Sequence, residues 1–173
     1  MYYQYPIEQV ATSTQTRYQN GFARMATYLL PRLEDIVYEP SSLGLKILAG
    51  DECALATPAE ILQQVYGEDV RLTSPRVRLL RDVAGIKEPV MNVRVQVRLS
   101  DVHAVVDDLA RRDAVTQEVD YQSSSAVIRA QATLRKLLRY QQAVAAMTDN
   151  TAEVWLWLSH YSLVGSGPEG AAT

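Results

Sequence analysis

The 173-residue chain has few of the residues that usually support covalent or metal chemistry. It contains one cysteine, Cys53, and two histidines, His103 and His160. A single cysteine cannot close an internal disulfide, and neither histidine has a cysteine or carboxylate at metal-ligand spacing. Asp107 and Asp108 are adjacent on a predicted helix, so their carboxylates point in different directions. We therefore expect no metal, no cofactor and no enzymatic activity.

Other sequence patterns are missing as well. There is no Gly-x-x-x-x-Gly-Lys-Ser/Thr stretch, so the chain cannot be a GTPase by itself. No apolar run approaches the roughly 18 residues that suggest a membrane span. The first ten residues, "MYYQYPIEQV", lack the charged and apolar segments of a secretory signal. We expect a cytoplasmic protein that does not enter a membrane.

The composition is that of a folded chain. Hydrophobic residues make up 47% of the sequence and charged residues 21%, enough apolar material for a core. The formal charge of −3 is spread evenly, since residues 1–86 carry 8 Lys/Arg against 10 Asp/Glu and residues 87–173 carry 9 against 10. Neither half has the basic excess of a nucleic-acid-binding domain.

In the first half, apolar periodicity predicts strands over 5–11, 35–40, 43–50 and 70–80, and helices over 14–30 and 57–67. The second helix is expected to begin at a Thr57 cap and to end before Gly67. Pro75 interrupts the last strand, which indicates an edge or a bulge. The first helix is expected to bury one apolar face, made of Tyr18, Phe22, Met25 and Leu29.

The second half repeats this order. Strands are predicted over 93–99, 114–121, 126–132 and 147–164, and helices over 100–113 and 134–147. Ser100 is expected to cap the first of these helices. Its apolar face is predicted to contain Val102, Val105, Val106 and Leu109.

Two consecutive βαββαβ units predict an α+β protein made of tandem ferredoxin-like sandwiches with antiparallel sheets. We place the first domain at residues 1–83 and the second at 88–164. Residues 165–173, rich in glycine, are expected to form a flexible tail. In each sandwich the helices cover one face of the sheet, and the other face is open.

The final strand is unusual because it is apolar on both alternating faces. Val154, Leu156 and Leu158 suit the covered face, whereas Trp155, Trp157 and Tyr161 are predicted to share the open one. In a ferredoxin-like sheet the last strand pairs with the first. The arginines expected near these aromatics are Arg94 and Arg98 on the first strand and Arg129 one strand further.

Three occupants of this face are conceivable: the other domain, a partner protein, or single-stranded bases stacked on aromatics interleaved with arginines. Tryptophan and arginine are favoured at protein interfaces, and the net charge is negative. We therefore favour a protein interface, with the first domain or a second copy, over nucleic acid. The cationic stretch "LRKLLR" (134–139) is interpreted as a solvated helix face and, secondarily, as a phosphate contact.

Several stretches resemble a known family. "EPVMNVRVQV", "DLARR" and "LSHY", with Tyr140, Thr148 and Ala152, fall at the spacing of the last domain of translation elongation factor G and of the related ribosome-protecting tetracycline-resistance factors. This resemblance covers residues 88–164. More faintly, "PIEQVA", "GFARMATYL", "LKILAG", "AEILQQVYG" and "VRLTSPRVRLLRD" resemble the third domain of the same factors. The resemblance implies domains three and five joined directly, without the GTPase, second and fourth domains.

The sequence also departs from the family. "GDECAL" (50–55) replaces a Gly-Met-Gly-Glu-Leu-His run, and "TDNTA" (148–152) replaces Thr-Gln-Gly-Arg-Ala, so a basic residue is lost at Thr151. The resemblance implies a non-catalytic ribosome- or translation-associated protein that occupies part of the factor site. The alternative is an interaction or assembly module that works through the Trp155/Trp157 face without the ribosome. The expected partner is thus the ribosome or another protein chain, including a separate GTPase subunit or a second copy.

Overall fold

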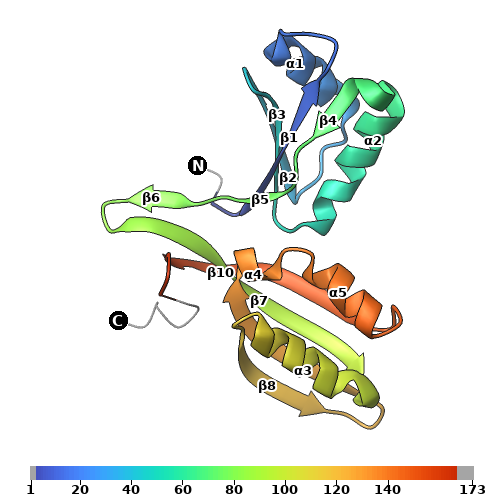
Figure 1. Ribbon diagram of the computed structural model, residues 1–173, viewed down its shortest axis with the longest axis vertical. Coiled ribbons are helices and arrows are strands. Elements are labelled where there is room, and N and C mark those ends of the chain that lie inside the picture. The colour runs from blue at the N-terminus through green and yellow to red at the C-terminus, as the bar shows by residue number, and fades with distance from the viewer. Residues whose placement is uncertain (1–2, 167–173) are drawn as a thin grey trace. The chain divides into compact units, whose positions relative to one another are not determined.

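The computed structural model describes residues 3–166 and divides into two units, Met1–Arg78 and Leu79–Thr173 (Figure 1). The division falls after Arg78 because β6 (Leu80–Asp82), expected in the first domain, pairs with β7 (Gly85–Arg98) of the second sheet. Of the predicted flexible tail 165–173, residues 167–173 lie outside the described residues.

The first unit is built around a four-stranded antiparallel path in the order β2-β3-β1-β4, and β5 also pairs with β1. A hairpin turn joins β2 to β3. Ile7, Ala11, Leu45, Ile47 and Leu62 are all inaccessible to solvent and form the centre of this core. The elements are β1 (Ile7–Ser13), α1 (Gln19–Leu29), β2 (Ile36–Ser41), β3 (Gly44–Ala49), α2 (Ala56–Tyr66), β4 (Val70–Leu72) and β5 (Arg76–Val77).

Helix α1 buries a different face from the one its large apolar residues predicted. Phe22, Ala23 and Ala26 are buried, whereas Met25 is 64% exposed and Tyr18 and Leu29 are also exposed. The alanines allow the helix backbone to approach the sheet closely, so the bulky residues beside them are turned outward. Only Phe22 of the predicted face is in the core.

The start of α2 also differs from expectation. Thr57 lies inside the helix, which follows directly on a 3₁₀ turn, η1 (Cys53–Leu55). The Asp51 carboxylate accepts a hydrogen bond from the Ala54 amide at 2.9 Å, so a carboxylate ahead of the turn takes the role predicted for Thr57. The end of the helix is as predicted, with Gly67 at φ 55°.

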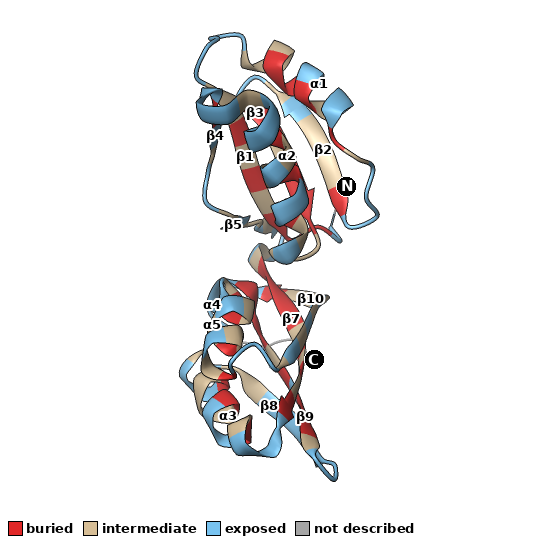
Figure 2. Ribbon diagram, turned by 90° about the vertical axis from the view of Figure 1, so that its right-hand side faces the viewer, coloured by how far each residue is buried: buried red, intermediate tan, exposed pale blue. Residues whose placement is uncertain are grey.

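The second unit repeats the topology in the strand order β10-β7-β9-β8, with β6 also on β7. Figure 2 shows its buried residues along β7 and on the helix sides that face the sheet. Alternation predicts one buried face made of Val93, Val95, Val97 and Leu99; the three valines are buried, whereas Leu99 lies in the turn that follows β7 and is exposed. The further elements are η3 (Leu99–Asp101), α3 (Val102–Arg111), β8 (Val115–Tyr121), β9 (Ser125–Thr133), α4 (Leu134–Leu137), α5 (Tyr140–Met147) and β10 (Glu153–Leu163).

Two helix predictions in this unit were wrong in detail. Ser100 does not cap α3: it lies in the turn η3, and its hydroxyl contacts the Asp101 carboxylate at 3.2 Å. The helix expected over 134–147 is split into α4 and α5, because Arg139 takes a left-handed conformation with φ 59°. The break lets both Leu137 and Tyr140 face the core, where each is at most 1% exposed.

Each unit therefore contains the order βαββαβ around an antiparallel sheet, and the predicted fold class of tandem ferredoxin-like sandwiches is confirmed. Among the described residues, no helix is both long enough and apolar enough to cross a lipid bilayer.

Candidate binding face of the second sheet

The open face of the second sheet carries a row of side chains that spans four strands. Trp155 on β10 pairs with Arg94 on β7, Arg94 with Arg129 on β9, and Arg129 with Glu118 on β8. Directly opposed residues on neighbouring strands point to the same face. The topology thus brings together Trp155, Arg94 and Arg129, as the sequence predicted.

The contacts in this row are specific. The Arg94 guanidinium carbon lies 4.4 Å from the centroid of the Trp155 ring, a cation–π contact. Arg129 Nη1 lies 2.7 Å from Glu118 Oε2, and both side chains remain substantially exposed. The Arg129 charge is therefore offset locally, and Arg94 supplies the cation nearest to the indoles.

A second row contains the amide pair that sequence reasoning missed. Trp157 pairs with Asn92 on β7, and Asn92 with Gln131 on β9. Gln131 Nε2 donates to Asn92 Oδ1 at 2.7 Å and to Ser159 Oγ at 3.2 Å. Strict alternation along β7 and β9 places both amides on the open face, and this signal could have identified them.

Arg98 does not flank the indoles as predicted. It pairs with Ser125 at the far end of β7, and its Nε donates to Asp101 Oδ2 at 2.8 Å. Its Nη2 also donates to the Thr148 carbonyl at 3.4 Å. These bonds hold the guanidinium at the start of α3, away from the rows that contain Trp155 and Trp157.

Tyr161 is also not on the tryptophan face. The register of β10 against β7 shifts between Leu158 and His160, so that Tyr161 pairs with Pro89. Pro89 belongs to the alternation of Met91 and Val93, which point toward the helices, whereas the partners of the tryptophans belong to the opposite set. The extra residue in β10 inverts the face of every residue that follows it.

Trp155 and Trp157 are 40% and 47% exposed. Each indole keeps a large apolar surface accessible, and they lie two residues apart on the same side of one strand, about 6.7 Å along it. The arrangement can accept a flat or apolar surface while Arg94 and the Asn92–Gln131 amides supply polar contacts. The cover of this face by protein stays a prediction.

Polar groups elsewhere form isolated features. Cys53 is exposed, and His103 Nδ1 faces Asp107 at 3.6 Å on the surface of α3. His160 Nδ1 contacts Ser159 Oγ at 3.0 Å, and its buried Nε2 finds no hydrogen-bond partner among the described residues. Within the described part of the chain, no group of three or more histidines, cysteines or carboxylates lies close enough to hold a metal ion.

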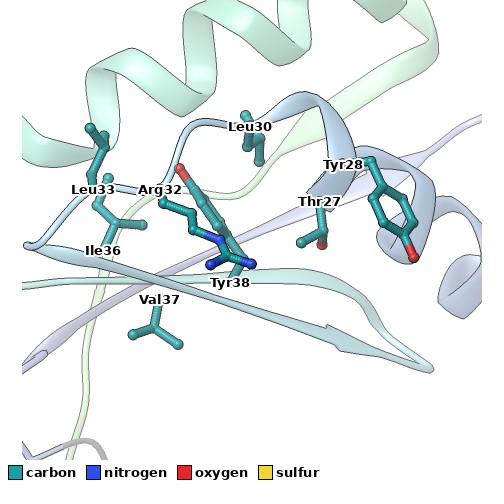
Figure 3. Close-up of a pocket in the computed structure, with 8 residues that line it drawn as sticks. All are labelled: Thr27, Tyr28, Leu30, Arg32, Leu33, Ile36, Val37 and Tyr38. Atoms are coloured by element: carbon teal, nitrogen blue, oxygen red, sulfur yellow. The ribbon is translucent and has the colours of Figure 1, made fainter.

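The first unit contains a cavity of about 540 Å³ beside α1 and β2. The Tyr38 hydroxyl is buried there without a hydrogen-bond partner among the described residues, and its burial raises the pKa of the phenol. Sequence reasoning gave no sign of this cavity, because its walls come from the connection between the two elements as well as from α1 and β2. Figure 3 shows its lining, which consists of Thr27, Tyr28, Leu30, Arg32, Leu33, Ile36, Val37 and Tyr38.

Comparison with known proteins locates the sequence similarity in the second unit. Residues 85–169 match the family described as elongation factor G C-terminus. The elongation factor G of Granulibacter bethesdensis is 33% identical over 79 residues, which are 46% of this chain and 11% of that protein. The resemblance of the second half to the last domain of elongation factor G is thereby confirmed.

The fold of both units recurs in a solved structure. A crystal structure from Thermus thermophilus matches 92% of this chain and 41% of its own, with a TM-score of 0.66 and 14% sequence identity. At that identity the likeness concerns the fold alone. The matched stretch is about a tenth of the Granulibacter protein and less than half of the Thermus chain.

Proposed function

We propose that the chain is an elongation-factor-G-like protein that associates with the ribosome and occupies part of the elongation-factor site without catalysis, because residues 85–169 match the elongation factor G C-terminus. The observation that carries this proposal is the match across the second unit, from β7 to β10. The lack of a phosphate-binding loop in the sequence supports a role without GTP hydrolysis. The proposed location is the cytoplasm.

The best candidates for phosphate contacts lie at α4 and directly after it. Arg135, Lys136 and Arg139 are all exposed. Arg135 contacts the buried Glu88 carboxylate at 3.1 Å, and Lys136 contacts Asp113 at 2.7 Å. These surface cations are close together in sequence but partly neutralised by their partners, which favours a small number of phosphate contacts and salt-sensitive binding.

Co-sedimentation with ribosomes tests the proposal. We expect binding at about 50 mM monovalent salt and a loss of affinity of about 10- to 40-fold at about 200 mM, the effect expected for two or three phosphate contacts. If the chain stays in the supernatant at low salt, with ribosomes at micromolar concentration, the proposal is wrong.

A charge variant locates the contact. Lys136→Glu should reduce ribosome binding several-fold and flatten its salt dependence, because it removes one phosphate contact and adds repulsion. Arg111→Glu is the matched control, since Arg111 is an exposed arginine at the end of α3. Equal losses in the two variants would show that the effect is one of overall charge and not of the α4 segment.

A further inference from the structure

The outer edge of β10 differs from the other sheet edges of the protein. Strand β10 is a terminal strand in the order β10-β7-β9-β8, and no described strand pairs with its outer side. It is 11 residues long, about 37 Å, and presents a row of backbone N–H and C=O groups along that side.

The remaining edges carry features that prevent pairing with another chain. Strand β8 contains Glu118 and Asp120, β2 contains Glu39 and Pro40, and β4, β5 and β6 are at most three residues long. Strand β10 has no lysine, arginine, aspartate or proline, its one carboxylate, Glu153, lies at its first position, and its bulge lies after Leu158, beyond the regular stretch 153–158. Long, apolar edges without such features favour pairing with another strand.

We propose that the outer edge of β10 is a homodimer interface, in which two copies of the strand pair antiparallel about a twofold axis at Leu156 and join the two second-unit sheets into one. This inference is independent of the proposed ribosome association. The dimer explains why β10 is apolar on both faces. Across the twofold axis, each face of the strand continues onto the same face of the second copy's strand, so apolar side chains meet apolar side chains on both sides of the joined sheet.

The register follows from self-complementarity. With the axis at Leu156, Trp155 of one copy lies opposite Trp157 of the other, so four indoles form one cluster on the open face. On the helix-facing side, Val154 lies opposite Leu158 and Leu156 opposite itself. Centring the axis on Trp157 would pair only one indole with its equivalent and leave Trp155 opposite Ser159.

Charge is compatible with this register. The ionisable side chains of β10 other than Tyr161 are Glu153 and His160. With the axis at Leu156, Glu153 of one copy lies near Ser159 and His160 of the other, at the bulge that follows Leu158, so no like charges face each other. The Arg94 guanidinium lies over the Trp155 ring, and Trp155 is still 40% exposed.

Sedimentation equilibrium of the full chain from about 1 to 100 μM tests the assembly. We expect the mass to rise from 19.3 kDa toward twice that value, and the tryptophan emission to shift to shorter wavelength in parallel. Trp155 and Trp157 are the two tryptophans of the sequence, so the emission reports on this strand. A chain that stays at 19.3 kDa at about 100 μM overturns the proposal.

Substitutions at Trp157 test whether the indoles form a dimer interface or bind another partner. Trp157→Glu should remain folded by circular dichroism and be monomeric at about 100 μM, whereas Trp157→Phe should weaken the dimer by less than about tenfold. Tyr121→Glu is the control, at the other edge of the same sheet. A wild-type monomer whose emission is quenched by a single-stranded oligouridine would instead assign the face to RNA and contradict the dimer.

Disulfide trapping tests the register even where Trp157→Glu fails to fold. In a Cys53→Ser background, Leu156→Cys should cross-link to itself on mild oxidation, because residue 156 lies opposite itself at about 5 Å between Cα atoms. Val154→Cys, on the same face, should cross-link at least about tenfold more slowly, since its equivalent lies about 13 Å away along the strand. Equal rates, or faster cross-linking of Val154→Cys, overturn the register.

Discussion

The two units share the order βαββαβ but are interrupted at different elements. In the first unit the second helix, α2, is continuous over Ala56–Tyr66, and the last strand is broken into β4 and β5 around Pro75. In the second unit the second helix is broken into α4 and α5 at Arg139, and the last strand, β10, is unbroken over 11 residues. One topology thus tolerates a break in either element, and only the unit with the intact final strand has a long edge available to a partner.

The largest expected effect concerns the broken helix. Tyr140 is inaccessible to solvent directly after the break, with the Arg112 guanidinium carbon 5.1 Å from its ring centroid. Tyr140→Ala should lower the free energy of unfolding of the second unit by about 3–5 kcal/mol, as expected for loss of a buried aromatic ring. Chemical denaturation followed by circular dichroism measures the change.

Tyr140→Phe is the matched control. The Tyr140 hydroxyl is buried without a hydrogen-bond partner among the described residues, so its removal should leave stability unchanged or raise it by about 1 kcal/mol. A loss above about 1 kcal/mol would mean that the hydroxyl has a partner in the folded protein. The helix break would then position a polar group as well as a ring.

The next effect concerns the end of the unbroken helix. Gly67 closes α2 at φ 55° and ψ −126°, a conformation that side chains disfavour. Gly67→Ala should therefore lower the free energy of unfolding of the first unit by about 1–3 kcal/mol, although nothing lies within 4 Å of the added methyl group.

Gly50→Ala provides the comparison in the same unit, because the nearest atom to its added methyl group is Asp35 Cβ at 4.0 Å. We expect a change within about 0.5 kcal/mol, measured by the same denaturation assay. If both alanine variants lower the free energy of unfolding by the same amount, the backbone conformation at Gly67 is not what ends α2.

The smallest effect concerns the 3₁₀ turn that precedes α2 in the first unit. Among the described residues, the second unit has no such turn at the corresponding place, because α4 follows β9 directly. Cys53 is exposed overall, but partial burial of its thiol, Asp51 and Glu52 all raise the pKa of that thiol. A raised pKa lowers the thiolate fraction at neutral pH, so alkylation by iodoacetamide at about pH 7.5 should be slower than for an unstructured thiol and should accelerate toward about pH 10.

Glu52→Gln should lower the pKa of Cys53 and shift the alkylation profile to lower pH, because one of the carboxylates beside the thiol is neutralised. An unchanged profile would show that Glu52 has no electrostatic influence on the thiol and that burial and Asp51 raise its pKa.

Much of this architecture was predictable because it depends on local patterns. Alternation along residues 93–97 located the central strand, and Gly67 and Pro75 located a helix end and a strand break. The predicted face of α1 was wrong because alanines, not the larger Met25 and Leu29, allow its close approach to the sheet.

The predicted placement of the site residues was correct where register alone determined it and wrong where irregular geometry intervened. Pairing of the first and last strands correctly brought Arg94 beside Trp155. The bulge after Leu158 could not be read from a period of two, and it moved Tyr161 to the other face. Arg98 lies away from the tryptophans because the Asp101 carboxylate and the Thr148 carbonyl hold it at the start of α3.

Competition with elongation factor G on the ribosome tests the central claim most directly. Ribosomes at low salt would be saturated with the fluorescently labelled chain and titrated with elongation factor G held in its GTP-bound form by a non-hydrolysable analogue. Shared occupancy of the factor site predicts complete displacement, with a midpoint that rises in proportion to the concentration of the labelled chain. Binding that persists at saturating elongation factor G would contradict the account and place the chain elsewhere on the ribosome.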